Sequence, residues 1–233
     1  MTKAEKKNER GVLMSPPMVL ATLAGRKTVT RRIIKDSKNY SCPYGDPPDR
    51  LWVRETFVIE DPREYWADLS RNGPPTDRPV KWIDDDYGHR PLIPHYRATE
   101  PEPHIVREDT MIDADEDRTR WKPSIFMPRW ASRITLEITG VRVERLQEIT
   151  PEDAIAEGLA AITKDGGQTT KYGISDRDGL PGCDDFGMNW REWSPDPVNA
   201  FARLWGSING PRGPESWAAN PFVWVIEFKK IRG

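Results

Sequence analysis

The sequence has few residues of the kinds that build disulfide frameworks or metal sites. Its 233 residues include two cysteines, Cys42 and Cys183, whose separation matches no metal-binding spacing. The three histidines, His89, His95 and His104, lie in a proline-rich acidic stretch. We therefore expect no disulfide framework, no metal and no other cofactor, which fits a reducing, cytoplasmic environment.

Long hydrophobic runs are also missing. No stretch of 18 apolar residues occurs, so we expect no membrane-spanning helix and no membrane partner. The first ten residues, MTKAEKKNER, are charged and contain no apolar segment, unlike a signal peptide. We expect residues 1–10 to form a flexible tail.

The chain has almost no net charge, but its charges are unevenly distributed. The formal value of −2 excludes a global electrostatic attraction to nucleic acid. Residues 1–39 nevertheless contain ten Lys or Arg against three Asp or Glu, whereas residues 60–120 are acidic. The acidic runs are typical of solvated loops.

Three segments carry helix signals. Ser15 suits an N-cap, the two prolines after it suit the first turn, and Gly25 suits the stop. Thr150, Pro151 and Gly158 have the same roles in the segment TPEDAIAEGL. A third helix is expected over residues 196–209, with an apolar face that comprises Val198, Phe201, Ala202 and Trp205.

The remaining periodic segments predict strands. Residues 28–34, 93–99 and 221–231 are expected to be strands, and residues 132–146 carry the clearest alternation, with Gly140 permitting a bulge. Residues 49–60 are expected to form one strand, with one face that comprises Leu51, Val53 and Glu55 and another that comprises Trp52, Arg54 and Thr56. Residues 123–131 are expected to be an irregular packed connection.

These elements predict an α+β fold. Strands outnumber helices and do not alternate with them regularly, which disfavours a parallel βαβ sheet. A small curled sheet or partly open barrel with helices at its ends fits better. We expect a single domain over residues 11–233 with two insertions, at about 61–120 and 161–194, the first containing a short helix over residues 63–70.

Positive charge is concentrated in one short segment. Residues 23–32 read LAGRKTVTRR and combine four cations with two threonine hydroxyls. Taken alone, such a segment suits a strand that contacts phosphates, because phosphate contacts need cations and are sequence-independent. A catalytic role for Lys27 and Thr30, which lie in the same segment as the arginines, also remains open.

The segment also carries a resemblance to a known family. A helix followed by AGRKTVTRR resembles the ASCH domain of the PUA-like superfamily, and three further segments match in the same order: DRLWVRE, ITGVRVERLQEITPEDAIAEGL and NPFVWVIEF. The resemblance covers residues 11–60, 121–160 and 195–231 and leaves both insertions unexplained. It implies a small, mostly antiparallel β-barrel with flanking helices. The longer form, with LWVRE and MPRWASRITLEI, looks like ASCH proteins of phages and prophages.

The resemblance implies an activity as well. Small bacterial ASCH proteins include an N(4)-acetylcytidine amidohydrolase, whose proposed catalytic Lys, Thr and Glu fall on Lys27, Thr30 and Glu157 of this sequence. Metal-independent hydrolysis of an N-acylated cytosine nucleoside is therefore expected. Other family members resemble nucleic-acid binders, and ribonuclease activity has been proposed for some. A non-catalytic module that binds RNA, DNA or a modified base, or a ribonuclease, thus remains the alternative.

The roles of the three residues stay open at this point. Lys27 is a base for Thr30 only if its pKa is lowered, and nearby Arg26, Arg31 and Arg32 would favour that, whereas Glu157 would oppose it. Alternatively, Glu157 is the acid and base and Lys27 stabilises the oxyanion.

The arginines of the basic segment, Arg26, Arg31 and Arg32, are candidates for substrate or nucleic-acid binding. Arg54 and Glu55 either pair with neighbours inside the barrel or line the pocket, in which case Glu55 is a rival to Glu157 as the working carboxylate. An aromatic side chain beside cations suits base stacking with phosphate contact. The candidates of this kind precede the long strand and comprise Trp121, Lys122, Ser124 and Arg129.

Overall fold

Five strands form the main sheet, which includes both the first and the last of the described strands. The computed structural model describes residues 7–35, 41–60, 73, 75–85, 88–100, 120–183 and 186–233. Along the sheet the strands are β1 (Glu9–Leu13), β3 (Arg50–Arg54), β7 (Thr135–Arg145), β10 (Phe222–Arg232) and β2 (Val29–Ile33). β1 runs parallel to β3, and every other neighbouring pair is antiparallel.

The pairing confirms a mixed α+β fold with mostly antiparallel strands. In the described part of the chain no ladder joins β1 to β2, so the main sheet is open. β1 begins at Glu9, inside the segment expected to be a tail, because its backbone bonds to β3. No helix of the described residues is long and apolar enough to cross a membrane.

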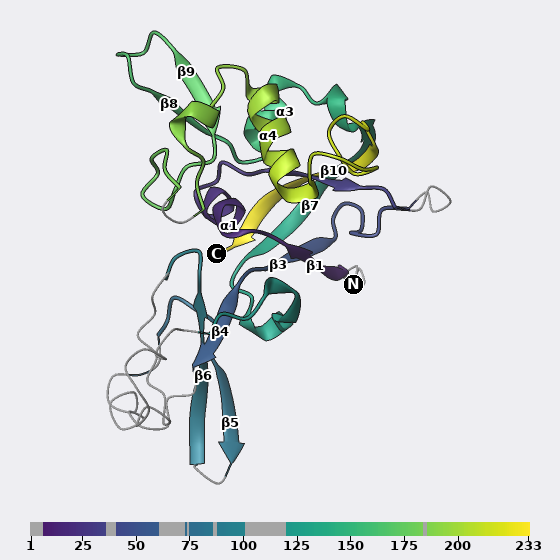
Figure 1. Cartoon of the computed structure of the whole chain (residues 1–233). Helices are drawn as coiled ribbons and strands as arrows, with labels where there is room; N and C mark the ends of the chain where they lie inside the picture. Colours follow the sequence, from purple (N-terminus) through teal and green to yellow (C-terminus); the bar gives the residue numbers. More distant parts are fainter. Residues whose placement is uncertain are drawn as a thin grey trace.

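Three α-helices lie beside the main sheet (Figure 1). They are α1 (Pro16–Leu23), α3 (Pro151–Ala156) and α4 (Pro197–Asn209), and each begins with a proline after an N-cap residue. The side chain of Thr150 accepts the expected capping bond from the Asp153 amide, whereas Ser15 makes no such bond. The predicted starts of α1 and α3 are confirmed.

The predicted buried face of α4 is partly wrong. Phe201 and Trp205 are buried as expected, but Val198 and Ala202 are only half-buried. Their places in the core are taken by Ala200 and Leu204. The difference arises because α4 packs against α3 on one side and against the strand Thr170–Gly173 on another, so two neighbours determine which of its residues are buried.

Residues 49–60 form two strands rather than the single predicted one. The alternation is confirmed, since Leu51, Val53 and Glu55 are all buried. After β3 the chain leaves the main sheet, and β4 (Phe57–Glu60) pairs instead with β6 (Gly88–Tyr96). The switch is held by a two-way backbone bridge between Phe57 and Lys122.

β4, β6 and β5 (Lys81–Asp85) form an arm that extends away from the main sheet (Figure 1). The arm explains part of the first expected insertion, and the strand expected at 93–99 is the end of the longer β6. The helix expected at 63–70 lies outside the described residues. The second expected insertion contributes a hairpin of β8 (Ala160–Thr163) and β9 (Thr170–Gly173).

Short connections complete the fold. The expected irregular connection contains 3-10 turns at Ser124–Phe126 and Arg129–Ala131, and two further turns lie at Leu146–Glu148 and Trp190–Glu192.

The pairing of β7 with β10 is interrupted by two register shifts. One lies where Glu227 faces Gly140 and Phe228 faces Ile138, and the other lies between Lys230 and Arg232. The first is the irregularity that Gly140 was expected to permit.

A charged cluster lies where the arm meets the body. His95 Nε2 donates to Glu60 Oε2 at 2.7 Å, and Nδ1 donates to Glu100 Oε2 at 2.6 Å. Glu100 also accepts from Arg78 at 2.9 Å. Burial disfavours a charged imidazole, but the two carboxylates outweigh it and raise the pKa of His95 to about 9. His95 is therefore an imidazolium that ties β4 to β6.

This geometry predicts a loss of stability in alkaline solution. Because the pKa of His95 is about 9 in the folded chain and about 6.5 when unfolded, its contribution is complete below pH 6.5. It disappears as the pH rises through 9. We expect His95→Gln to lower the free energy of unfolding at pH 6 by roughly 2–3 kcal/mol, measured by urea titration. At pH 10 the variant and the natural chain should be equally stable; a constant difference at both pH values would contradict the assignment.

Candidate functional site

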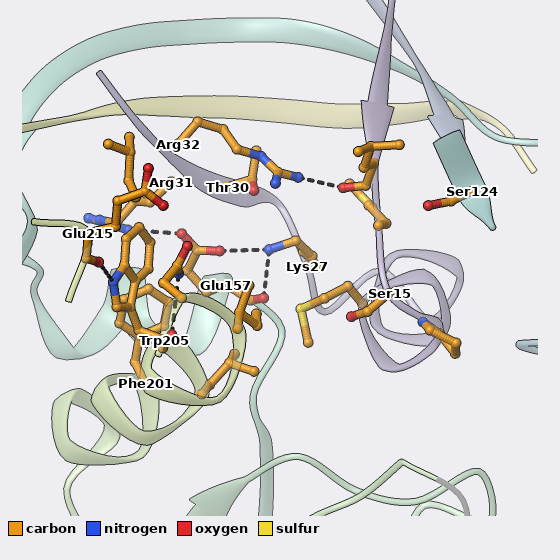
Figure 2. Close-up of a pocket in the computed structure, with 18 of the residues that line it drawn as sticks. Ser15, Lys27, Thr30, Arg31, Arg32, Ser124, Glu157, Phe201, Trp205 and Glu215 are labelled. Atoms are coloured by element: carbon orange, nitrogen blue, oxygen red, sulfur yellow. Dashed lines mark hydrogen bonds and ion pairs between the residues drawn. The ribbon is translucent and has the colours of Figure 1, made fainter. Parts of the chain in front are cut away.

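A cavity of about 590 Å³ opens beside β2, between α1 and α4. Lys27, Thr30, Arg31, Arg32 and Glu157 all line it, so the structure brings the three predicted catalytic residues and two predicted arginines to one place (Figure 2). Its volume lies within the range of small-molecule sites. In the described part of both insertions no residue lines this cavity.

Backbone hydrogen bonds hold the segment that carries Lys27. The amides of Arg26 and Lys27 both donate to the Ala21 carbonyl of α1, and the Thr28 amide donates to the Ala156 carbonyl at the end of α3. Gly158 ends α3 with a φ of +108°, which favours glycine. A Cβ there would lie 3.2 Å from Lys27 Cβ, so the glycine permits the close approach.

Lys27 and Glu157 form a buried ion pair at the base of the cavity (Figure 2). Lys27 Nζ donates to Glu157 Oε2 at 2.7 Å and to the backbone carbonyls of Val29 and Glu157, each at 2.8 Å. These three acceptors match the three protons of an ammonium group. The pair joins positions 130 residues apart in the sequence.

Opposing effects act on the protonation of Lys27. Burial is the largest and lowers the pKa of Lys27, the charge and hydrogen bond of Glu157 raise it, and the charges of Arg32 and Arg31 lower it further. The net direction is downward. Lys27 thus loses its proton more readily than an exposed lysine would.

Arg31 links the pair to a chain of surface carboxylates. Its side chain is fully buried, with NH2 at 2.6 Å from Asp153 and 3.2 Å from Glu144. Its NH1 is 3.5 Å from Glu157 Oε1, a weaker contact. Arg142 pairs with both Asp153 and Glu144. Arg31 is therefore neutralised chiefly by carboxylates outside the cavity and acts as a structural support.

Thr30 lies on β2 with its side chain in the cavity wall. Its backbone position is fixed by pairing with Ile226 of β10. Within the part of the chain that the structure describes, its hydroxyl makes no hydrogen bond to Lys27 or Glu157. The hydroxyl is thus placed to meet a ligand rather than to sustain the ion pair.

Glu55 is excluded from the cavity and does not compete with Glu157 there. Its carboxylate receives two hydrogen bonds from Arg133, both 2.9 Å long. Burial raises the pKa of Glu55, although Arg133 opposes the shift. The residue supports the turn from β3 to β4, and of the two candidate carboxylates Glu157 is the one that lines this cavity.

Several other predicted binding residues lie elsewhere. Arg26 is exposed and faces a separate cavity of about 220 Å³, and Arg54 and Arg129 lie over the Trp52 ring. Neither Trp121 nor Lys122 lines the main cavity, whereas Ser124 does. Of the four candidates expected before β7 to bind a base or a phosphate, Ser124 is therefore the one that lines this cavity.

Sequence reasoning missed the apolar walls of the cavity. Side chains of α4 form one wall, with Phe201, Leu204 and Trp205, while Met14 and Met18 come from the region of α1. The periodicity of residues 196–209 identified Phe201 and Trp205 as core residues, but it carried no signal that they also border a cavity. Tyr44 and Thr56, which also line it, lie outside any motif.

We predict that Glu157→Gln lowers the pKa of Lys27 further. The substitution removes the negative charge that stabilises the ammonium form but keeps an oxygen acceptor, while burial and the arginine charges remain. A titration of the Lys27 side-chain nitrogen by ¹⁵N NMR measures the shift. Glu215→Gln is the matched control, because Glu215 also lines the cavity but pairs with Lys35. An unchanged Lys27 titration in Glu157→Gln would disprove the coupling.

The described residues include no group of three His, Cys, Asp or Glu side chains positioned to hold a metal ion. Comparisons with protein-family models, with curated proteins and with solved structures find no match to this chain.

Proposed function

We propose that this chain is an ASCH-type protein that hydrolyses the amide of an N-acylated cytosine nucleoside without a metal ion. The observation that supports the proposal is the buried Lys27–Glu157 pair in a cavity that Thr30 also lines. The open, mostly antiparallel sheet with helices beside it is compatible with a partly open PUA-like barrel.

The cavity suits a planar base. Phe201 and Trp205 provide aromatic surface on one side, and the sulfur-containing side chains of Met14 and Met18 provide adaptable apolar surface. Trp205 Nε1 already donates to the Glu215 carbonyl at 2.8 Å, which fixes the indole. A cytosine ring between these groups would expose its exocyclic amide toward the polar base of the cavity.

Glu157 then carries the proton transfers, and Lys27 supplies positive charge. In the proposed reaction Glu157 takes a proton from water as the oxygen attacks the acyl carbon, and the nearby positive charge of the Lys27 ammonium stabilises the resulting oxyanion. The carbon–nitrogen bond breaks as Glu157 returns the proton to the departing amine. The products are a carboxylic acid and the unmodified cytosine nucleoside.

This assignment favours water over Thr30 as the attacking group. All three Lys27 protons have oxygen acceptors, so the amine has no lone pair directed at the Thr30 hydroxyl. We propose that Thr30 orients the acyl group by a hydrogen bond. The same saturation of Lys27 is the observation that favours the alternative, a module that binds a modified base without chemistry.

The test is turnover of N(4)-acetylcytidine by the purified chain, measured as the rate of cytidine release. We expect Lys27→Ala and Glu157→Ala each to reduce kcat/KM by roughly a hundredfold or more. Thr30→Val should reduce it by about tenfold, the loss of one hydrogen bond in the transition state.

Glu55→Gln is the matched control, since it alters a buried carboxylate outside the cavity. It should lower stability but retain turnover in the folded fraction. Binding of N(4)-acetylcytidine without any cytidine release would replace the hydrolase proposal with the binding module. Equal turnover by the natural chain and both alanine variants would refute the assigned site.

A further inference from the structure

Arg32 differs from the other charged groups of the cavity because no carboxylate of the described residues neutralises it. Lys27 pairs with Glu157, Arg31 pairs with carboxylates behind the wall, and Lys35 lies 3.6 Å from Glu215. In the described ranges no carboxylate lies within ion-pair distance of Arg32. Among these residues the charge of Arg32 is therefore available to an anionic ligand.

The guanidinium of Arg32 is held in place but not saturated. Its NH2 donates to the Leu13 carbonyl at 2.6 Å, which directs the side chain toward the end of β1 (Figure 2). A guanidinium has five N–H donors, and the Leu13 carbonyl accepts from one of its nitrogens. A ligand in the cavity can therefore accept from the remaining terminal N–H groups of Arg32.

Hydroxyl groups line the same cavity as Arg32. Ser15 precedes α1, and its side chain makes no capping bond. Thr56 and Ser124 also line the cavity. Figure 2 shows Ser15 and Ser124 on the opposite side of Lys27 from Phe201 and Trp205. The cavity thus has an aromatic end, an ion pair in the middle, and an end with hydroxyls near the arginine.

We propose that the hydroxyl-lined end of the cavity binds a phosphate group, so that the ligand is a nucleotide rather than an uncharged nucleoside. This inference depends on the proposed function for the base but not on the hydrolysis. A guanidinium binds phosphate with paired, charge-assisted hydrogen bonds. A phosphate there would satisfy Arg32 and leave the Lys27–Glu157 pair free to act on the base.

The same phosphate chemistry occurs in a free mononucleotide and in a polynucleotide strand. Either source presents an anion at the sugar while the base occupies the aromatic end. The exposed side chains of Ile125 and Phe126 follow Ser124 at the cavity, and a neighbouring nucleotide of a strand would contact them. A mononucleotide would leave them bare, so the two sources are separable by experiment.

The test compares three probes that need no turnover: cytidine, cytidine 5′-monophosphate and a single-stranded trinucleotide with a central cytidine. Binding is measured by calorimetry at low salt. We expect the monophosphate to bind about tenfold more tightly than cytidine, or better, because one charge-assisted contact has this magnitude. Equal affinities of cytidine and its monophosphate, or no binding of any probe, would overturn the phosphate site.

Variants of Arg32 identify the responsible group. Arg32→Gln should abolish the preference for phosphate, measured as the ratio of the monophosphate and cytidine affinities in the same variant, and Arg32→Lys should restore part of it. Arg26→Gln is the matched control, because it removes the same charge from a neighbouring position that faces a different cavity. A preference that survives in Arg32→Gln, or is lost equally in Arg26→Gln, would refute the assignment to Arg32.

The trinucleotide identifies the source of the phosphate. Tighter binding than the monophosphate, reduced by Phe126→Ala, assigns a strand as the ligand. Weaker binding assigns a mononucleotide. If hydrolysis of N(4)-acetylcytidine is absent but the phosphate preference and its Arg32 dependence are present, the phosphate site stands and only the reaction is refuted.

Discussion

The ion pair between Lys27 and Glu157 is the interaction on which the site depends. A buried charge is tolerated only when it is paired and hydrogen-bonded. Here two backbone carbonyls and one carboxylate surround the ammonium. Satisfying them requires the end of α3 to lie against the turn after α1, so the pairing aligns two distant segments and forms the floor of the cavity.

The positive charges around this pair differ in how far they are neutralised. Behind the cavity, Arg31 and Arg142 both pair with Glu144 and Asp153, and these two carboxylates neutralise the two arginines. Within the cavity, Lys27 is matched by Glu157, whereas Arg32 has no counter-charge among the described residues. A ligand with one anionic group and a planar base complements this distribution. The proposed reaction and the proposed phosphate contact therefore use different parts of one cavity.

Buried charges are also paired where the arm meets the main sheet. His95 is charged between Glu60 and Glu100, and Arg133 satisfies Glu55 where the chain leaves the main sheet. Both clusters join segments around the point where β3 gives way to β4. The buried carboxylate of Glu55 thus supports the architecture, while that of Glu157, at the end of α3, faces the cavity. The residue type alone does not reveal this difference.

Local sequence determined the helix starts, the alternation of Leu51 and Val53, and the register shift at Gly140, because capping, strand period and glycine geometry act over a few residues. Motif resemblance placed Lys27, Thr30 and Glu157 together as a hypothesis. Only the tertiary structure decided that Glu55 lies elsewhere, that residues 49–60 divide between two sheets and that α4 lines the cavity. These outcomes depend on contacts between segments far apart in the chain, which neither periodicity nor spacing encodes.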